Sequence, residues 1–337
     1  MNSTSPAVSV IMPVRNGGPW LIAAVDSILH QTLADLELVI IDDHSSDGAI
    51  RQLPADARIR VFPVQGSGIV CALNTALDMA RGRWIARMDA DDIAMPERLR
   101  CQRDYLLANR AVHLVGAEVE WLEENAVAGG NRRYLNWLNR LQSPESIRRE
   151  IYIESPLPHP TWFAERSFFQ RLGGYRDLGW AEDYDLLLRA DLMGLRMGKP
   201  AGTLLYWREH PDRLTRVDQR YSKQQFAAAK AHCLAHGRLA EAGENRPVLI
   251  WGAGPGGTLL HDALARESVG VDGFVEVHPR RIGGLKRNKP VVHFETLKEH
   301  ADALILVAVG VPSARREIRD FLAGLERVEG EDYLFVT

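Results

Sequence analysis

The chain has 337 residues, of which 46% are hydrophobic and 25% charged, and its formal net charge is −3. These values fit a globular protein long enough for two domains, and they exclude a fibrous repeat, a disordered chain and a generally basic, nucleic-acid-coating surface. No apolar run approaches the roughly 20 residues of a membrane span, and the polar N-terminus does not resemble a secretion signal. The three cysteines form no C-x-x-C pair, which fits a reducing cytoplasm without a disulfide framework.

Strand-like and helix-like patterns alternate through the first ninety residues. Apolar runs predict strands at 8–14, 36–41, 58–64 and 84–88, and helical periodicity predicts helices at 20–30 and 69–81. Ligands of open α/β sheets bind at the carboxyl ends of the strands. We therefore expect the polar segments 13–16, 42–47 and 89–92, each directly after a strand, to converge on one crevice.

The rest of the chain predicts a variable region and then a second α/β unit. Residues 121–155 mix aromatic and charged side chains, with a helix opened by Ser143, Pro144 and Glu145. A helix over 218–236 leads to a small, polar segment at 237–246. Beyond it we expect strands at 248–251, 271–277 and 304–309, with a helix ending at Arg266 after the first strand.

The sharpest local signal is the sequence Asp89-Ala90-Asp91-Asp92 after a predicted strand. Side chains two apart on an extended segment point the same way, so Asp89 and Asp91 can share one cation. Mg²⁺ and Mn²⁺ favour such oxygen ligands and complete their shells with water and substrate phosphate. The alternative is an acidic turn that caps the helix beginning at Pro96.

A second polar cluster, Asp42 to Asp47, also follows an apolar strand. A carboxylate there can accept hydrogen bonds from a base N–H or a ribose hydroxyl. The same residue types are those that any tight turn prefers. The cluster alone therefore leaves a binding role and a turn open.

Together these segments resemble the ordered signature of family 2 glycosyltransferases. The resemblance covers about residues 6–216 and is carried by the segments 10–16, 27–32, 37–47, 72–74, 80–82, 89–92, 159–161, 173–175, 181–186 and 208–210. It implies an α/β GT-A fold with a mixed, mainly parallel sheet over 1–216. Beyond the resemblance we expect a helical linker at 217–245 and a smaller Rossmann-like accessory domain at 246–337, which departs from the minimal family pattern. The resemblance also implies metal-dependent transfer of a sugar from a nucleotide diphosphate donor, with inversion at the anomeric carbon.

The same resemblance assigns roles to individual residues. Asp183 matches the base that deprotonates the acceptor, with the adjacent Glu182 left open, and Asp91 matches the direct metal ligand. Asp89 matches the metal and ribose-phosphate position, and His210 is a further candidate metal or phosphate contact. The donor nucleotide is expected at Pro13, Arg15, Asn16, Asp42, Asp43, Asn74, Arg87 and Asp89. Candidate acceptor contacts are Trp180, His159 and Arg208, although a packed structural role for His159 and a surface loop for Arg208 and His210 stay open.

The glycine-rich segment Gly252, Gly254 and Gly257, with Glu276 beyond it, has the form of a dinucleotide fingerprint after a strand. Pro255 interrupts the phosphate turn, and no convincing catalytic set follows. We interpret these residues as a candidate second nucleotide site, or alternatively as the frame of a structural or regulatory domain.

The expected partners are a nucleotide sugar, with a uridine diphosphate donor favoured, and a glycan or lipid-linked acceptor in surface polysaccharide synthesis. No nucleic-acid partner is expected. We expect a cytoplasmic protein and leave peripheral contact with the inner face of the membrane open. The alternative functions are a sugar-nucleotide pyrophosphorylase, for which segment 15–19 is only a partial phosphate loop, and a nucleotide- or NAD-binding module without transfer activity.

Overall fold

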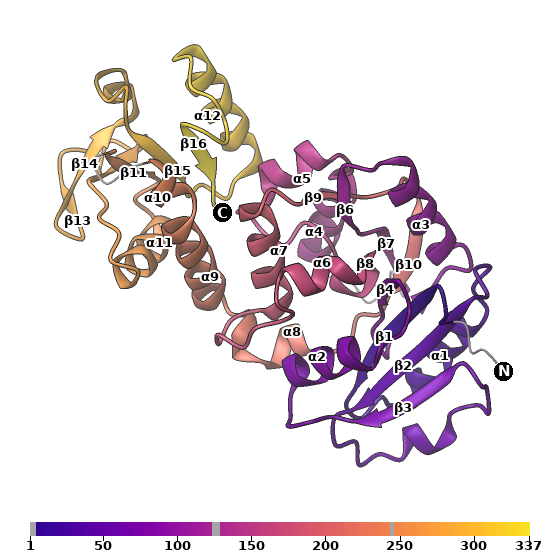
Figure 1. The fold of residues 1–337 in the computed structure, drawn as a ribbon. Helices are drawn as coiled ribbons and strands as arrows, with labels where there is room; N and C mark the ends of the chain where they lie inside the picture. The colour runs from indigo at the N-terminus through magenta and orange to yellow at the C-terminus, as the bar shows by residue number, and fades with distance from the viewer. Residues whose placement is uncertain (1–4, 123–128, 243–245) are drawn as a thin grey trace. The chain divides into compact units, whose positions relative to one another are not determined.

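The computed structural model describes residues 5–122, 129–242 and 246–337, and in it the chain forms two compact units (Figure 1). Unit 1 comprises Met1–Arg148, Pro156–Leu178 and Asp185–Val217. Unit 2 comprises Arg149–Ser155, Gly179–Tyr184 and Asp218–Thr337. We describe each unit by itself.

A seven-stranded sheet, counted over the described residues, forms the centre of unit 1. Its strands, in the order in which they pair, are β3 (Ile59–Pro63), β2 (Leu36–Asp42), β1 (Val8–Val14), β4 (Trp84–Arg87), β8 (Phe163–Glu165), β6 (Val112–Val115) and β9 (Arg196–Gly198). All neighbouring pairs are parallel except those made by β8, which is antiparallel to both β4 and β6. The predicted mixed, mainly parallel α/β sheet is therefore confirmed.

Strand β1 is buried along its whole length, which is typical of a strand covered by helices on both faces of a sheet. Helix α1 buries Leu21, Ala24, Val25 and Ile28, the three- and four-residue spacing of a single helical face. The helices of unit 1 and of its junctions with unit 2 are α1 (Leu21–Leu29), α2 (Ile69–Met79), α3 (Arg98–Ala108), α4 (Gly129–Arg140), α5 (Pro144–Glu150), α6 (Arg166–Arg171), α7 (Glu182–Leu192) and α8 (Leu214–Val217). Short 3-10 helices lie at Gly18–Trp20, Ala49–Gln52 and His159–Thr161.

A second, smaller sheet of unit 1 links the turn at residues 90–91 to the segment that begins at residue 208. Its strands are β5 (Ile93–Ala94), β10 (Thr203–Trp207) and β7 (Glu118–Trp121), with β10 in the middle. Strand β10 is antiparallel to β5 and parallel to β7. The residues after β10 are thereby placed beside the turn that precedes β5.

Unit 2 contains a six-stranded sheet that is parallel except at one edge. Its strands, in pairing order, are β13 (Leu285–Lys286), β14 (Lys289–His293), β12 (Gly273–Glu276), β11 (Val248–Trp251), β15 (Leu304–Val307) and β16 (Tyr333–Phe335). Its helices are α9 (Lys223–His236), α10 (Arg238–Ala242), α11 (Pro255–Arg266) and α12 (Pro312–Gly324), with 3-10 turns at Gln219–Tyr221 and Phe294–Glu299. Strands β11, β12 and β15 are fully buried, so they form the core of this unit.

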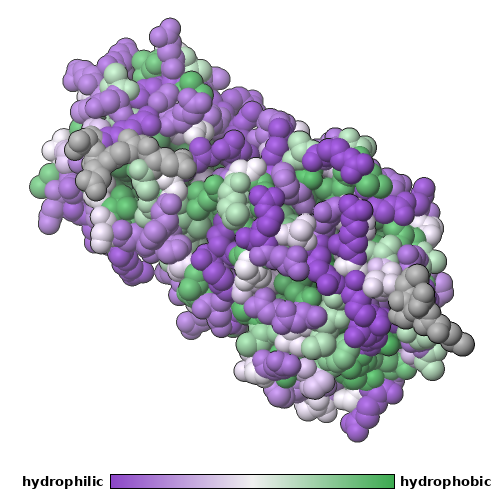
Figure 2. All heavy atoms as spheres, viewed as in Figure 1, coloured by the Kyte–Doolittle hydropathy of each residue, from purple (hydrophilic) through white to green (hydrophobic). Residues whose placement is uncertain are grey.

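Most elements expected in both α/β regions are confirmed, with ends that differ by a few residues. The segment expected as a linker at 217–245 carries α9 and α10, and its residues 243–245 lie outside the described residues. No helix in the described ranges is both long and apolar enough to cross a membrane. On the face shown in Figure 2, hydrophilic residues are interspersed with apolar ones.

Candidate active site

The parallel pairing of β1, β2 and β4 brings the expected site segments of unit 1 to one edge of the sheet. Val14 is level with Asp42, and Ile11 is level with Arg87. Beyond the strand ends, the Asp43 amide donates to the Val14 carbonyl at 2.8 Å and the Met88 amide to the Ile11 carbonyl at 3.0 Å. The expected convergence of the three segments follows from this register.

The loop after β1 is held against the loop after β2 by backbone-to-side-chain hydrogen bonds. The Asn16 amide donates to Ser45 Oγ at 3.0 Å, and the Ser46 amide donates to Asn16 Oδ1 at 2.8 Å. The Gly18 amide donates to Asp47 Oδ2 at 2.8 Å. Asn16 has a positive φ of 55°, a conformation that asparagine adopts more readily than most residues. Asn16 therefore shapes this pair of loops.

The two aspartates after β2 differ in their surroundings. Asp42 Oδ1 accepts from the Ser45 amide at 2.9 Å, so this carboxylate closes a turn. Asp43 is only 4% exposed and accepts from the Gly68 amide through both oxygens, at 3.1 and 3.2 Å. The exposed Arg15 lies with Nη1 3.9 Å from Asp43 Oδ2. Pro13 is buried within β1.

Three carboxylates gather in the turn after β4. One oxygen from each of Asp89, Asp91 and Asp92 lies within 4.8 Å of the others. Burial, and then the charge of Asp89, raise the pKa of Asp91. Burial and the charges of Asp91 and Asp89 raise the pKa of Asp92 well above its ordinary value. Burial and the proximity of the other carboxylates therefore both disfavour the ionised forms of Asp91 and Asp92.

Two buried arginines, Arg87 and Arg98, lie next to this turn. Arg87 Nη1 lies 2.5 Å from Asp89 Oδ2, and the Arg87 side chain is 5% exposed. Burial alone would lower the pKa of Arg87, but the adjacent Asp89 holds it above its ordinary value. Arg98 is fully buried and donates through Nη2 to the Arg87 carbonyl at 2.5 Å, while burial lowers its own pKa to about 9.

The segment after β10 meets the same turn. The Arg208 amide donates to Asp92 Oδ1 and its Nε donates to the Asp91 carbonyl, both at 2.9 Å. His210 Nε2 lies 2.8 Å from Asp91 Oδ2, and its ring centroid is 4.5 Å from that of Trp20. The structure thus brings Asp91, Arg208 and His210 together from positions more than a hundred residues apart.

Sequence reasoning missed two residues of this cluster. Asp92 was not counted among the metal candidates because Asp89 and Asp91 were assumed to lie on an extended segment, whereas residues 90 and 91 form a turn. The turn lets Asp92 contribute an oxygen as well. The signal available was the adjacent pair of aspartates. Trp20, which contacts His210 and lies beneath the Arg208 guanidinium at 5.4 Å, carried no sequence signal of its own.

The acid pair at the start of α7 belongs to unit 2, where Glu182 and Asp183 have different environments. Glu182 is 1% exposed and accepts from the Tyr221 hydroxyl at 2.9 and 3.1 Å. Arg220 Nη1 lies 3.9 Å from Glu182 Oε2. Burial, and then the charge of Glu182, raise the pKa of Tyr221 well above its ordinary value, which keeps this hydroxyl protonated as a donor. Asp183 is only half-buried.

The remaining expected contacts lie in packed positions. Asn74 Nδ2 donates to the Tyr175 carbonyl and its Oδ1 accepts from the Tyr175 amide, both at 2.9 Å. His159 is buried with Nε2 2.9 Å from the Tyr175 hydroxyl, and burial lowers its pKa well below the ordinary value, so its ring is neutral. In unit 2, the ring of the half-buried Trp180 lies 5.4 Å from that of His232. Nucleotide or acceptor roles for these residues stay predictions.

In unit 2 the glycine-rich segment begins directly after β11 and runs into the first turn of α11, as a dinucleotide fingerprint requires. Gly252 has a φ of +116°, and a Cβ on Gly257 would lie 1.9 Å from the Gly252 carbonyl oxygen. Glu276 ends β12 and pairs with Arg281 at 2.9 Å. A cavity of about 430 Å³ is lined by Gly252, Gly254, Glu276 and Arg281, among others.

Comparison with known proteins identifies the family of this site. The model described as glycosyl transferase family 2 matches residues 9–173. The O-antigen biosynthesis glycosyltransferase WbnJ of Escherichia coli is 30% identical over 212 residues, which are 60% of this chain and 80% of WbnJ. The chain belongs to glycosyltransferase family 2. This transferase spans only 36% of another relative, the bifunctional glycosyltransferase pgtA of Dictyostelium discoideum, at 27% identity over 276 residues and 68% of its own length.

Solved structures agree on the GT-A fold of this family 2 transferase. Staphylococcus aureus TarS 1–349, in complex with UDP-GlcNAc, gives a TM-score of 0.56 at 17% identity and covers 77% of this chain and 72% of TarS. The mannosyltransferase PcManGT of Pyrobaculum calidifontis, in complex with GDP-Man and Mn²⁺, gives 0.50 at 22% identity, covering 79% and 74% of the two chains. The turn after β4 is thus the candidate centre of a glycosyltransferase.

Proposed function

We propose that this enzyme transfers a sugar from a nucleotide diphosphate donor, with UDP favoured, to an acceptor hydroxyl with inversion of the anomeric centre, and that it uses Mn²⁺ or Mg²⁺. The observation that carries the proposal is the grouping of Asp89, Asp91 and Asp92 within 4.8 Å at the end of β4. That position is the ligand-binding edge of an open α/β sheet.

The residues of this turn fit a divalent cation. All donors in the cluster are carboxylate oxygens, the ligands that Mg²⁺ and Mn²⁺ favour. Among the described residues, the buried Asp92 Oδ2 has no hydrogen-bond partner, and burial, followed by repulsion from the neighbouring carboxylates, raises the pKa of both Asp91 and Asp92. We assign Asp91 as the direct ligand, with Asp89 and His210 beside it. When bound, the cation supplies neutralising charge for the departing diphosphate.

Donor binding is proposed at the adjoining loops. Asp43 is held rigidly by the Gly68 amide and lies near Arg15, so it can accept from a base N–H while the exposed arginine faces the nucleotide. Asn16 positions the loop that carries Arg15. The uridine preference rests on the family resemblance, and a TarS structure that contains UDP-GlcNAc supports it.

Asp183 is proposed as the base that takes the acceptor proton. In this step the acceptor O–H proton passes to the Asp183 carboxylate, the oxygen bonds to the anomeric carbon, and the bond from that carbon to the diphosphate oxygen breaks. Attack opposite the leaving group inverts the centre. Glu182 suits this role less because it is buried and engaged by the Tyr221 hydroxyl. Glu182 is instead proposed to position the start of α7.

The acceptor is proposed to be a glycan or lipid-linked sugar of a surface polysaccharide. The relative WbnJ is named for O-antigen biosynthesis, which supports this class. Trp180 offers an aromatic ring on which a sugar can stack, and it precedes Asp183 by three residues.

The test is sugar release from UDP-sugars, and transfer to added acceptors, with Mn²⁺ present. Asp91→Ala should lower turnover at least about 100-fold, because a catalytic cation contributes several kcal/mol and each 1.4 kcal/mol is a factor of ten. Asp104→Ala, a change at an exposed aspartate on α3, is the matched control and should leave turnover intact. Equal turnover of the two variants would refute the metal role of Asp91.

A second proposal concerns the cavity beside Gly252 and Gly254, which we interpret as a nucleotide site in unit 2. Because Gly252 and Gly254 have no side chains, a phosphate group can come close to the backbone there. Glu276 lies at the strand end where ribose hydroxyls bind in such folds. NAD⁺ and UDP should each be titrated against the full chain by calorimetry. Binding that Glu276→Gln weakens, without change in transfer activity, would support the site, and absence of any binding would reject it.

A further inference from the structure

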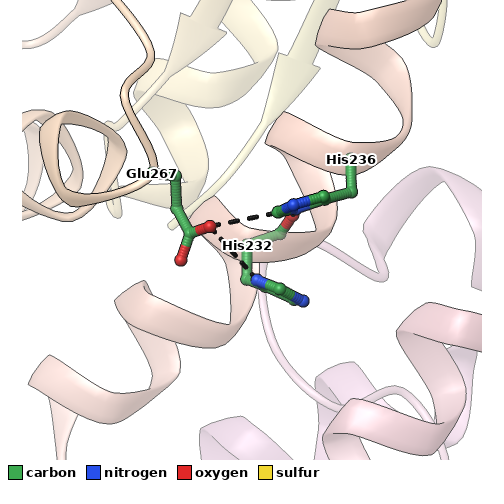
Figure 3. Close-up of side chains that lie close together, drawn as sticks. All are labelled: His232, His236 and Glu267. Atoms are coloured by element: carbon green, nitrogen blue, oxygen red, sulfur yellow. Dashed lines mark hydrogen bonds and ion pairs between the residues drawn. The ribbon is translucent and has the colours of Figure 1, made fainter.

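Three side chains of types that can bind metal, His232, His236 and Glu267, meet in unit 2, and none of the three has been assigned a role above (Figure 3). His232 and His236 lie one turn apart on α9, and Glu267 follows the last residue of α11. Glu267 Oε2 lies 3.2 Å from His232 Nδ1 and 3.8 Å from His236 Nδ1. The two imidazole centroids are 4.3 Å apart. One donor atom from each residue lies within 4.8 Å of the others.

We propose that these residues bind a divalent transition-metal ion, with Zn²⁺ as the reference ion. Two imidazoles and a carboxylate form a mixed nitrogen and oxygen donor set, which suits zinc and its neighbours, whereas Mg²⁺ and Ca²⁺ take oxygen donors. Three protein ligands leave the fourth tetrahedral position to water or to an added ligand. The site therefore differs in chemistry from the all-carboxylate turn after β4.

The protein already orders the two histidines. His236 Nδ1 lies 2.8 Å from the His232 carbonyl, and a ring that donates its Nδ1–H there keeps its lone pair on Nε2. The Trp180 ring lies 5.4 Å from the His232 ring and is tilted by 42° to it. Helix α9 is capped at its start, where the Ser222 side chain accepts from the Gln225 amide.

The ion would join α9 to the end of α11, and so to the sheet core that α11 covers. Metal that binds only the folded arrangement raises its stability. Zinc binding is thus expected to raise the melting temperature of unit 2.

The experiment uses the full chain without a histidine tag, stripped of metal and then titrated with Zn²⁺ in excess Mg²⁺, which occupies the carboxylate turn. His236→Gln is compared with His30→Gln, a matched control because His30 Nδ1 also lies 2.8 Å from the carbonyl four residues earlier, Asp26. His236 is 61% exposed, so the substitution is compatible with folding, which circular dichroism verifies.

We expect the wild type and His30→Gln to bind one zinc with imidazole ligands in X-ray absorption spectra. His236→Gln should bind it more weakly by at least the roughly 10- to 100-fold that loss of even an outer-shell partner costs. Glu267→Gln should also weaken binding. Equal zinc affinity of wild type and His236→Gln, or zinc bound only by oxygen ligands, would overturn the proposal.

Discussion

The carboxylates at the end of β4 in unit 1 and at the end of β12 in unit 2 have opposite electrostatic surroundings. The turn after β4 gathers three carboxylates, and burial with mutual repulsion raises the pKa of Asp91 and Asp92. At the end of β12 a single carboxylate, Glu276, pairs with Arg281. Burial there would raise the pKa of Glu276, but the bonds from Arg281 and from two backbone amides lower it.

This difference fits the proposal that the turn after β4 binds a cation, whereas Glu276 at the end of β12 already has the cationic partner Arg281. Charge left uncompensated in a folded protein destabilises the fold, so its presence calls for a ligand that supplies the opposite charge. The end of β12 has no such excess, and a ligand there would be bound by shape and by hydrogen bonds. The comparison therefore supports the proposal that cation-assisted chemistry takes place in unit 1.

The largest effect is expected from Asp183→Asn, because Asp183 is the carboxylate proposed to take the acceptor proton. Turnover should fall about 10²- to 10⁴-fold, the range of general-base catalysis. Glu182→Gln keeps an acceptor for the Tyr221 hydroxyl and should change turnover much less. Steady-state kinetics with saturating UDP-sugar measures both. The opposite ranking of the two variants would make Glu182 the base.

A large stability effect is expected at the glycine loop of unit 2. A methyl group on Gly257 would lie 1.9 Å from the Gly252 carbonyl oxygen, so Gly257→Ala should destabilise unit 2 by about 1–3 kcal/mol or more. Gly254→Ala is the control, since the nearest atom to its added methyl lies 3.8 Å away. Hydrogen exchange of peptides from β11 and β12 reports on this unit. Similar exchange in the two variants would show that the loop can relax.

The regular parts of both units were predictable from sequence. The runs at Val8–Val14 and Val248–Trp251 were expected with the bounds that the structure has, because buried parallel strands are continuous apolar runs between polar turns. The antiparallel strand β8 was not expected. It has only three residues and no alternating pattern, so its pairing depends on distant partners in β4 and β6.

The candidate site was predictable in its residue types but not in its contacts. The order of the acidic motifs along the chain pointed to Asp91, and the parallel register explains why the motifs meet. The contact of His210 with Asp91 depends on β10 pairing with β5, a long-range pairing with no local signal. The turn that adds Asp92 depends on backbone geometry within three residues, which side-chain periodicity does not report.

We expect the free energy of unfolding to change with pH in opposite directions through Asp92 in unit 1 and through Glu276 in unit 2. The pKa of Asp92 is raised in the folded protein, so the free energy of unfolding of unit 1 is highest below the ordinary value of 3.8 and falls as the pH rises through the raised value. In metal-free buffer Asp92→Asn should reduce this fall and raise the free energy of unfolding of unit 1 at pH 7. Hydrogen exchange of β1 and β4 peptides against pH tests it. Added Mn²⁺ should flatten the wild-type profile, and an unaltered profile would contradict the cation site.

The smallest effect is expected from Glu276→Gln. The pKa of Glu276 is lowered, so its contribution to stability is present above the ordinary value of 4.5 and is lost as the pH falls through the lowered value. Because the Arg281 side chain is 53% exposed, water screens the pair, and the substitution should cost less than about 1 kcal/mol at pH 7. After correction for the intrinsic pH dependence of hydrogen exchange, the protection of β12 peptides should therefore increase in the wild type as the pH rises through the lowered pKa. Glu276→Gln should lose this increase. If both units instead lost stability as the pH rose, Glu276 would carry uncompensated charge as Asp92 does, and the end of β12 would become a second candidate cation site.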